Sequence, residues 1–197
     1  THVEVTRDVL ESDPFDAPPA GPAPTPSSAV APDLDRALER IRAARRPVLV
    51  AGKGAWYPVV SAALIALAEA LEAPVCHTWE GHGAMPTVHP LSLGPFRVME
   101  THPAVLSVLG AADLIVGVGV RIGTEPFRAL EEDYGGDQLL ILDAPDAPTR
   151  DFGPRIGSVA SLAASLRALA AAVHPSPLAG SARATCAGRG PMLIPAP

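Results

Sequence analysis

The chain has 197 residues, of which 48% are hydrophobic, and this length and composition predict one folded domain with its own core. Its net charge of -6 argues against a general affinity for nucleic acids or anionic membranes, and we find no apolar run of the roughly 20 residues that a membrane-spanning helix needs. The 2 cysteines form neither a disulfide framework nor a zinc motif, so we expect a cytoplasmic protein.

Both ends of the chain have the composition of linkers. Residues 1–10 alternate like a β-strand and lead into a stretch rich in proline, which disfavours helix and inner strand alike. The far end is rich in proline, glycine, alanine and serine and has no amphipathic period. We therefore predict three parts: a strand with a Pro-rich linker at 1–32, a folded body at 33–173 and a flexible linker at 174–197.

The folded body opens with a helix and a strand. Apolar residues recur at helical spacing from Leu34 to Ile41, behind Asp33 as a plausible N-cap, and Pro47 ends this helix. Residues 47–51 (PVLVA) then predict a strand. Arginines interleaved with acidic residues indicate that the helix has a solvated face: Arg36, Arg40, Arg42, Arg45 and Arg46.

A Gly-Lys-Gly corner, residues 52–54, joins this strand to a second predicted helix at 58–72, with Pro58 in its first turn. Such a corner can hold a phosphate at a helix N-terminus, where backbone N–H groups and the helix dipole favour an anion. It can equally be a tight turn without a ligand. The third glycine of a dinucleotide fingerprint would fall at Tyr57, which argues against a hydride-transfer dehydrogenase.

Further strands are predicted at 74–78, 112–120 and 138–143, and residues 155–173 predict a last strand that leads into an Ala/Leu-rich helix. These short, nearly all-apolar runs are typical of parallel strands covered on both faces. Their alternation with helices predicts a doubly wound, mainly parallel α/β fold with six strands and helices on both faces. Ligands of such folds bind beyond the carboxyl ends of the strands.

The carboxyl ends of four predicted strands carry the candidate binding residues. Glycine-rich or polar corners follow these strands at 52–54, 78–83, 119–123 and Asp143. The histidines match no short metal-ligand motif, so we predict no metal site. Three aromatic residues near the corners could stack on a base or anchor the packing of helix starts: Trp56, Tyr57 and Trp79.

The order of these corners resembles the central domain of thiamine-diphosphate-dependent enzymes, nearest to the acetolactate synthase and oxalyl-CoA decarboxylase types. The resemblance covers residues 33–173 and rests on "RPVLVAGKGA", "GHGAMPTVHPLSLG", "AADLIVGVGVRIG" and "LLILDAPD". The long loop "GHGAMPTVHPLSLG", residues 81–94, is its most specific element. Residues 1–10 also resemble the closing strand of the pyrimidine-binding domain. The implied fold is Rossmann-like, of the DHS-like NAD/FAD-binding type.

The resemblance implies a parent enzyme that uses thiamine diphosphate and Mg²⁺ as a transferase or lyase on 2-keto acids. The GDG motif that binds the diphosphate in the family is absent from this chain, as is the domain that carries the activating glutamate. We therefore expect the chain alone to be inactive and not to bind thiamine diphosphate. Its expected partners are the pyrimidine- and diphosphate-binding domains of a homo-oligomeric parent, with this chain alone a monomer or weak dimer.

The resemblance also implies an ADP or FAD site. Carried over by position, Gly52, Lys53 and Gly54 would face phosphates or ribose. Thr78 and Gly81 would lie on the adenine side, Gly119 and Arg121 at the diphosphate, and Asp143 at a ribose hydroxyl. Flavin-containing members carry an aromatic and two acidic residues where this chain has 122–124 (IGT), which favours ADP over FAD.

Several alternatives stay open from the residues alone. Arg121 could form an ion pair with Glu125 or Asp133, and Asp143 could cap the turn that follows it. The whole chain could be a structural or interaction module with an empty nucleotide crevice. An independent nucleotide-dependent enzyme of sirtuin-like topology is a third interpretation, but the sequence lacks a convincing catalytic His with an adjacent Asn or Asp motif.

Overall fold

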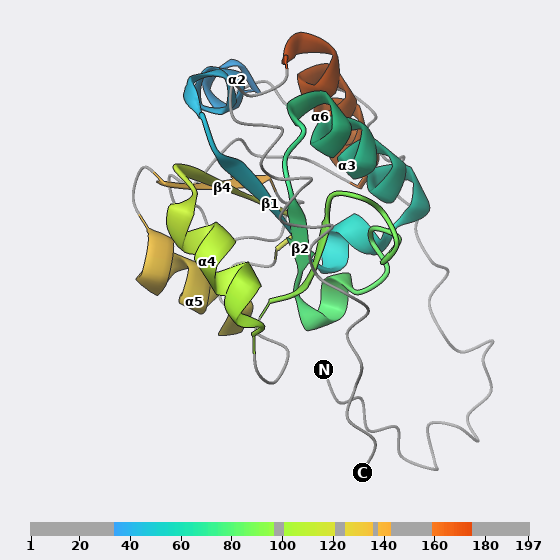
Figure 1. Cartoon of the computed structure of the whole chain (residues 1–197). Helices are drawn as coiled ribbons and strands as arrows, with labels where there is room; N and C mark the ends of the chain where they lie inside the picture. The colour runs from blue at the N-terminus through green and yellow to red at the C-terminus, as the bar shows by residue number, and fades with distance from the viewer. Residues whose placement is uncertain (1–33, 97–100, 121–124, 136–137, 143–158, 175–197) are drawn as a thin grey trace, which may run out of the picture.

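The computed structural model describes residues 34–96, 101–120, 125–135, 138–142 and 159–174. These residues form a parallel sheet with helices on both faces (Figure 1). The strands are β1 (Pro47–Ala51), β2 (Val75–His77), β3 (Ser92–Pro95), β4 (Leu114–Val118) and β5 (Leu139–Leu142). The helices are α2 (Leu34–Ala43), α3 (Pro58–Leu71), α4 (Pro103–Ala111), α5 (Glu125–Tyr134), α6 (Val159–Ala172) and the short 3-10 helices η2 (Lys53–Trp56) and η3 (Trp79–Gly81).

The strand order is β3-β2-β1-β4-β5, and every neighbouring pair is parallel. The chain runs outward from β1 to β2 and β3, and then returns through α4 to place β4 on the other side of β1. The order therefore reverses between β1 and β4, which makes their carboxyl ends a topological switch point. This confirms the predicted doubly wound α/β fold.

The described sheet has five strands where we predicted six. The predicted strands at 1–10 and before α6 lie outside the described residues, as does the proposed N-cap Asp33. Conversely, β3 lies within the loop 81–94 and extends one residue beyond it, and we did not predict it as a strand. Its sequence, SLGP, contains a glycine and a proline, which strands generally disfavour but tolerate at an edge such as this one.

Alternate residues of each strand face two separate layers of the core. Leu49 and Ala51 of β1 pack with α2, α3 and α6 on one face. Val48 and Val50 pack with α4 and α5 on the other. Figure 1 shows the same division, with α2, α3 and α6 above the sheet and α4 and α5 below it. Because both faces are covered, all five positions of β1 are buried, which explains its unbroken apolar run.

Local signals determine the ends of α3. Pro58 stands in its first turn, where the missing N–H costs nothing. The helix ends where Glu72 adopts a left-handed φ of 49°, and the Ala73 N–H then donates to the Ala68 carbonyl at 2.9 Å. The predicted helix at 58–72 is therefore confirmed. Among the described helices, none is long and apolar enough to cross a membrane.

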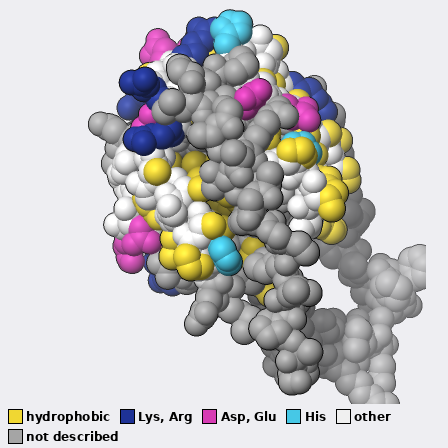
Figure 2. Space-filling model, in the orientation of Figure 1, with side chains coloured by type: hydrophobic (Ala, Val, Ile, Leu, Met, Phe, Trp, Pro, Cys, Tyr) yellow, Lys and Arg dark blue, Asp and Glu magenta, His cyan; other side chains and the backbone are white. Residues whose placement is uncertain are grey.

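The arginines of α2 do more than solvate its outer face. The Arg40 guanidinium donates to the Leu139 carbonyl at 2.9 Å, and Arg42 donates to the Ala172 carbonyl at the end of α6 at 2.9 Å. Figure 2 shows Lys and Arg side chains gathered at the upper left, where Figure 1 places α2. The prediction of a solvated face holds for Arg42, whose side chain is exposed although it is bonded. It was wrong for Arg40, which is half-buried because its partner comes from a distant segment of the chain.

Candidate functional site

The carboxyl edge of the sheet brings together most of the predicted site residues. Gly52 follows β1 and leads into η2, Thr78 follows β2 and leads into η3, and Gly119 follows β4. In Figure 1, η2 is the short cyan turn to the right of β2, and η3 is the light-green turn below β2. Two of the predicted residues, Arg121 and Asp143, lie outside the described residues.

Backbone contacts at the β1–β4 switch point account for three of the glycines. The Gly52 N–H donates to the Val118 carbonyl at 2.9 Å, and the Gly54 N–H donates to the Gly119 carbonyl at 3.0 Å. A Cβ at Gly52 would overlap the Gly119 carbonyl oxygen, and one at Gly54 would lie 2.7 Å from the Gly119 Cα. Gly119 itself has a φ of 63°, a backbone conformation that residues with a side chain rarely adopt. The two chain segments therefore touch directly.

The corner after β2 is packed in the same way. The Thr78 N–H donates to the Ala51 carbonyl at 2.9 Å, and the Thr78 residue is only 3% exposed. A Cβ at Gly81 would overlap that same carbonyl oxygen and lie 2.7 Å from its carbon. Thr78 and Gly81 thus hold η3 against the end of β1, and neither is offered to solvent.

These contacts limit the backbone groups that could bind a phosphate at this edge. The N–H groups of Gly52 and Gly54 donate to carbonyls, and the Gly119 N–H donates to the Leu142 carbonyl at 2.8 Å. Amides already bonded in this way are not free to hold an anion. The alternative interpretation of the Gly-Lys-Gly corner, a tight turn without a ligand, therefore accounts for its two glycines. The exposed side chain of Lys53 remains as a positive charge at this corner.

The aromatic residues at the edge do not anchor the packing. Trp56, at the end of η2, is 61% exposed, and Trp79, at the start of η3, is 71% exposed. The packing interpretation of these two residues was therefore wrong. Sequence reasoning could weigh only their position at helix starts, whereas exposure depends on which distant segments cover them.

Two histidines meet at the end of β2. The rings of His77 and His82 lie 5.0 Å apart, edge to face, and the His77 Nδ1 lies 3.1 Å from the Thr78 carbonyl oxygen. Burial lowers the pKa of His77 below its ordinary value, and the nearby His82 lowers it further, while the Thr78 contact opposes both effects. Within the described part of the chain, His, Cys, Asp and Glu form no group of three or more that could hold a metal ion.

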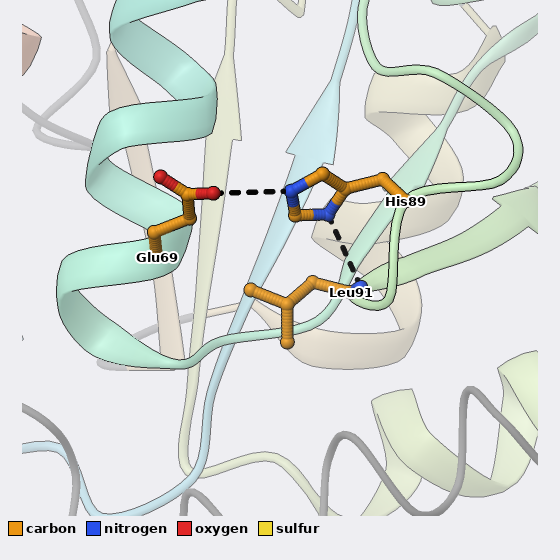
Figure 3. Close-up of polar contacts among 3 residues, drawn as sticks. All are labelled: Glu69, His89 and Leu91. Atoms are coloured by element: carbon orange, nitrogen blue, oxygen red, sulfur yellow. Dashed lines mark hydrogen bonds and ion pairs between the residues drawn. The ribbon is translucent and has the colours of Figure 1, made fainter.

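His89 connects the loop 81–94 to α3, as Figure 3 shows. Its Nδ1 accepts from the Leu91 N–H at 3.2 Å, so its Nε2 carries the proton and donates to the Glu69 carboxylate at 3.3 Å. The Ser61 hydroxyl adds a second connection, because it donates to the Ala84 carbonyl at 2.7 Å. Glu69 is largely exposed, so the contribution of its pair to stability is small, about 1 kcal/mol or less. Side chains therefore help to hold the part of the loop that precedes β3 against α3.

This doubly wound sheet, with its glycine-packed switch point and its long loop held on α3, corresponds to a known domain. Residues 34–169 match the model of the thiamine pyrophosphate enzyme central domain. The chain belongs to this family. The match agrees closely with the resemblance predicted for residues 33–173.

Individual relatives agree with this assignment. The glyoxylate carboligase of Escherichia coli O157:H7 is 30% identical over 137 residues, which covers 69% of this chain and 23% of that protein. A Mycobacterium bovis protein named "Probable acetolactate synthase" is 33% identical over 160 residues, 77% of this chain and 25% of its own length.

A solved structure supports the fold. It comes from a Mycobacterium smegmatis protein assigned to the thiamin diphosphate-dependent enzymes, with a TM-score of 0.51, 27% identity, and coverage of 78% of this chain and 30% of that one. The chain therefore spans about a quarter of the length of the curated relatives described above.

Proposed function

We propose that this chain is the non-catalytic central domain of a larger thiamine-diphosphate-dependent carboligase or decarboxylase that acts on 2-keto acids. The observation that carries the proposal is the match to the family's central domain over residues 34–169. In this role the sheet supports the pyrimidine- and diphosphate-binding domains of a homo-oligomeric, cytoplasmic parent. When bound in the parent, thiamine diphosphate supplies the electron sink for breaking bonds next to a keto group.

The residues of this chain do not fit thiamine diphosphate itself. The sequence contains no GDG motif to hold a magnesium-bound diphosphate. The described residues also lack a cluster of three or more potential metal ligands. The domain's own contribution is therefore scaffolding. We also propose a separate adenine-nucleotide site at the carboxyl edge of the sheet.

The topology supports a nucleotide at this edge. The switch point between β1 and β4 is where ligands of doubly wound folds bind. Because the glycine amides there are already bonded, we assign the attraction for phosphate to the exposed Lys53 and to Arg121, with Asp143 at a ribose hydroxyl. Gly52, Gly54, Thr78, Gly81 and Gly119 then shape the floor of the site rather than donate to the ligand.

Calorimetric titration of ADP, ATP and FAD into the chain tests the nucleotide site. We expect ADP to bind at micromolar or weaker affinity and Lys53→Ala to weaken it about 3- to 10-fold, because one exposed charge contributes modestly. Arg121→Ala should weaken ADP binding and flatten its dependence on salt. Arg36→Ala on α2 removes an equal charge from an exposed site before the amino end of β1 and should leave ADP affinity unchanged. Substituting Gly54 would not be a clean probe, since a Cβ there meets the Gly119 backbone.

The outcomes separate the alternatives. Absence of nucleotide binding below millimolar concentration would favour a structural or interaction module with an empty crevice. Binding of FAD without ADP would instead favour a flavin-containing domain. Titration with magnesium and thiamine diphosphate should show no saturable binding, and micromolar affinity there would contradict the non-catalytic role.

A further inference from the structure

Both tryptophans of the chain stand at the carboxyl edge of the sheet. The sequence contains 2 tryptophans, Trp56 in η2 and Trp79 in η3, and both residues are mainly exposed. Large aromatic side chains are usually covered, and exposed ones often mark places where a ligand or a partner binds. Neither position is required by the packing of the domain, so the two indoles need a different explanation.

The sheet places the two indole-bearing turns next to each other. β1 and β2 are neighbours, with Ala51 opposite His77, so η2 and η3 leave the sheet side by side and contact each other. Neighbouring strands lie about 4.8 Å apart, so one small molecule can reach the elements that follow both. Lys53 begins η2, which follows β1, and Trp79 begins η3, which follows the neighbouring strand β2. The charge of Lys53 is therefore carried by the turn next to the one that carries Trp79.

The two indoles differ in their surroundings. Trp56 lies against Gly83, where an added Cβ would be 3.8 Å from the Trp56 Nε1. Trp79 is the more exposed of the two, at 71%. It directly follows Thr78 and precedes Gly81, the two residues that the family resemblance implies on the adenine side of the site. Trp79 is therefore the better candidate for contact with a base.

We propose that the Trp79 indole is the platform on which the adenine base of the nucleotide stacks. The inference rests on the nucleotide site proposed above and assigns its base-recognition residue. Base–indole stacking needs only an exposed aromatic face, and it complements a phosphate held by the charge of Lys53.

Intrinsic fluorescence can report this contact directly. In Trp56→Phe the only indole left is Trp79, and ADP should quench its emission saturably. Inorganic pyrophosphate, which has the phosphates but no base, should not quench this emission. In the reciprocal variant Trp79→Phe, the emission of Trp56 should change little. Excitation should be at the red edge of indole absorption, where adenine does not absorb. FAD is unsuitable as a probe, because the flavin absorbs indole emission without stacking.

Calorimetry on alanine variants gives the energetic test. Trp79→Ala should weaken ADP roughly 5- to 30-fold and leave the affinity for pyrophosphate unchanged. Trp79→Phe, which keeps an aromatic face, should recover most of the loss, and Trp56→Ala should have a smaller effect. Unchanged far-ultraviolet circular dichroism would show that the variants fold.

Two results would overturn the proposal, and they differ. If ADP binds the wild type and Trp79→Ala equally well, the stacking assignment is wrong while the nucleotide site stands. If the wild type binds no ADP, the nucleotide site itself fails, and the exposed indoles belong to a surface that another domain covers.

Discussion

The carboxyl edge of the sheet has a floor of closely packed glycines and a rim of exposed side chains, and different physical constraints act on the two. In the floor, the backbones of Gly52 and Gly54 each lie against the backbone of Gly119, and the N–H groups of all three are bonded within the chain. At the rim, Lys53 and Trp79 are exposed and packing does not determine their identity. The comparison shows that a glycine-rich corner can look like a phosphate cradle and yet be explained by close packing. Ligand chemistry is then to be sought in the side chains around it.

The largest effect is expected in the floor, from Gly81→Ala. Its new Cβ would overlap the Ala51 carbonyl oxygen, a backbone atom that cannot move without displacing the end of β1. We expect a loss of about 3 kcal/mol in the free energy of unfolding, or failure to fold. Urea unfolding followed by circular dichroism measures it.

Gly110→Ala is the matched control for this substitution. Gly110 lies in α4, and a Cβ there would meet nothing within 4 Å. The variant should be more stable than wild type by about 0.5 to 1 kcal/mol, because alanine is the better helix former. Similar destabilisation of both variants would contradict the packing explanation of the floor.

A smaller effect is expected between floor and rim, at His77. Burial keeps the folded-state pKa of His77 below its ordinary value of 6.5, so the unfolded chain takes up the proton first as the pH falls. The free energy of unfolding should therefore decrease as the pH falls through 6.5, until the pH is below the folded-state pKa. Above 6.5 the group is neutral in both states and has no effect.

Chemical unfolding at a series of pH values from about 7.5 to about 5.5 tests this sign. His77→Gln stays neutral throughout, so the part of the acid sensitivity due to His77 should disappear. If the variant and the wild type lose stability in parallel, the sensitivity comes from other groups and His77 is not the responsible residue.

The smallest effect on stability is expected at the rim. Trp79→Phe and Trp56→Phe should each change the free energy of unfolding by less than about 0.5 kcal/mol, because both side chains are mainly exposed. Thermal unfolding of the two variants provides the measurement. A decrease of more than about 1 kcal/mol in the free energy of unfolding would mean that the indoles contribute to the packing of the domain.

Sequence alone determined the fold class and the central helices and strands. The apolar runs of β1, β2, β4 and β5 and the helical periods of α2, α3 and α6 are local patterns that reflect burial on one or both faces. The family resemblance rested on four motifs, of which the loop 81–94 was the most specific, and the match over residues 34–169 confirmed it. The elements missed are β3, α4 and α5. For β3 the local signal is weak, because it contains Gly94 with a φ of 89°, and in the described sheet it pairs with β2 alone.

Tertiary structure decided which residues at the edge are available to a ligand. Gly54 and Gly119 are far apart in the sequence, and only their contact shows that the Gly54 amide is already bonded. Likewise, the exposure of Trp79 follows from what the rest of the chain leaves uncovered. A sequence pattern can report the conformational freedom that a position requires, but the partner of each backbone amide and the cover over each side chain depend on segments that meet only in the folded protein.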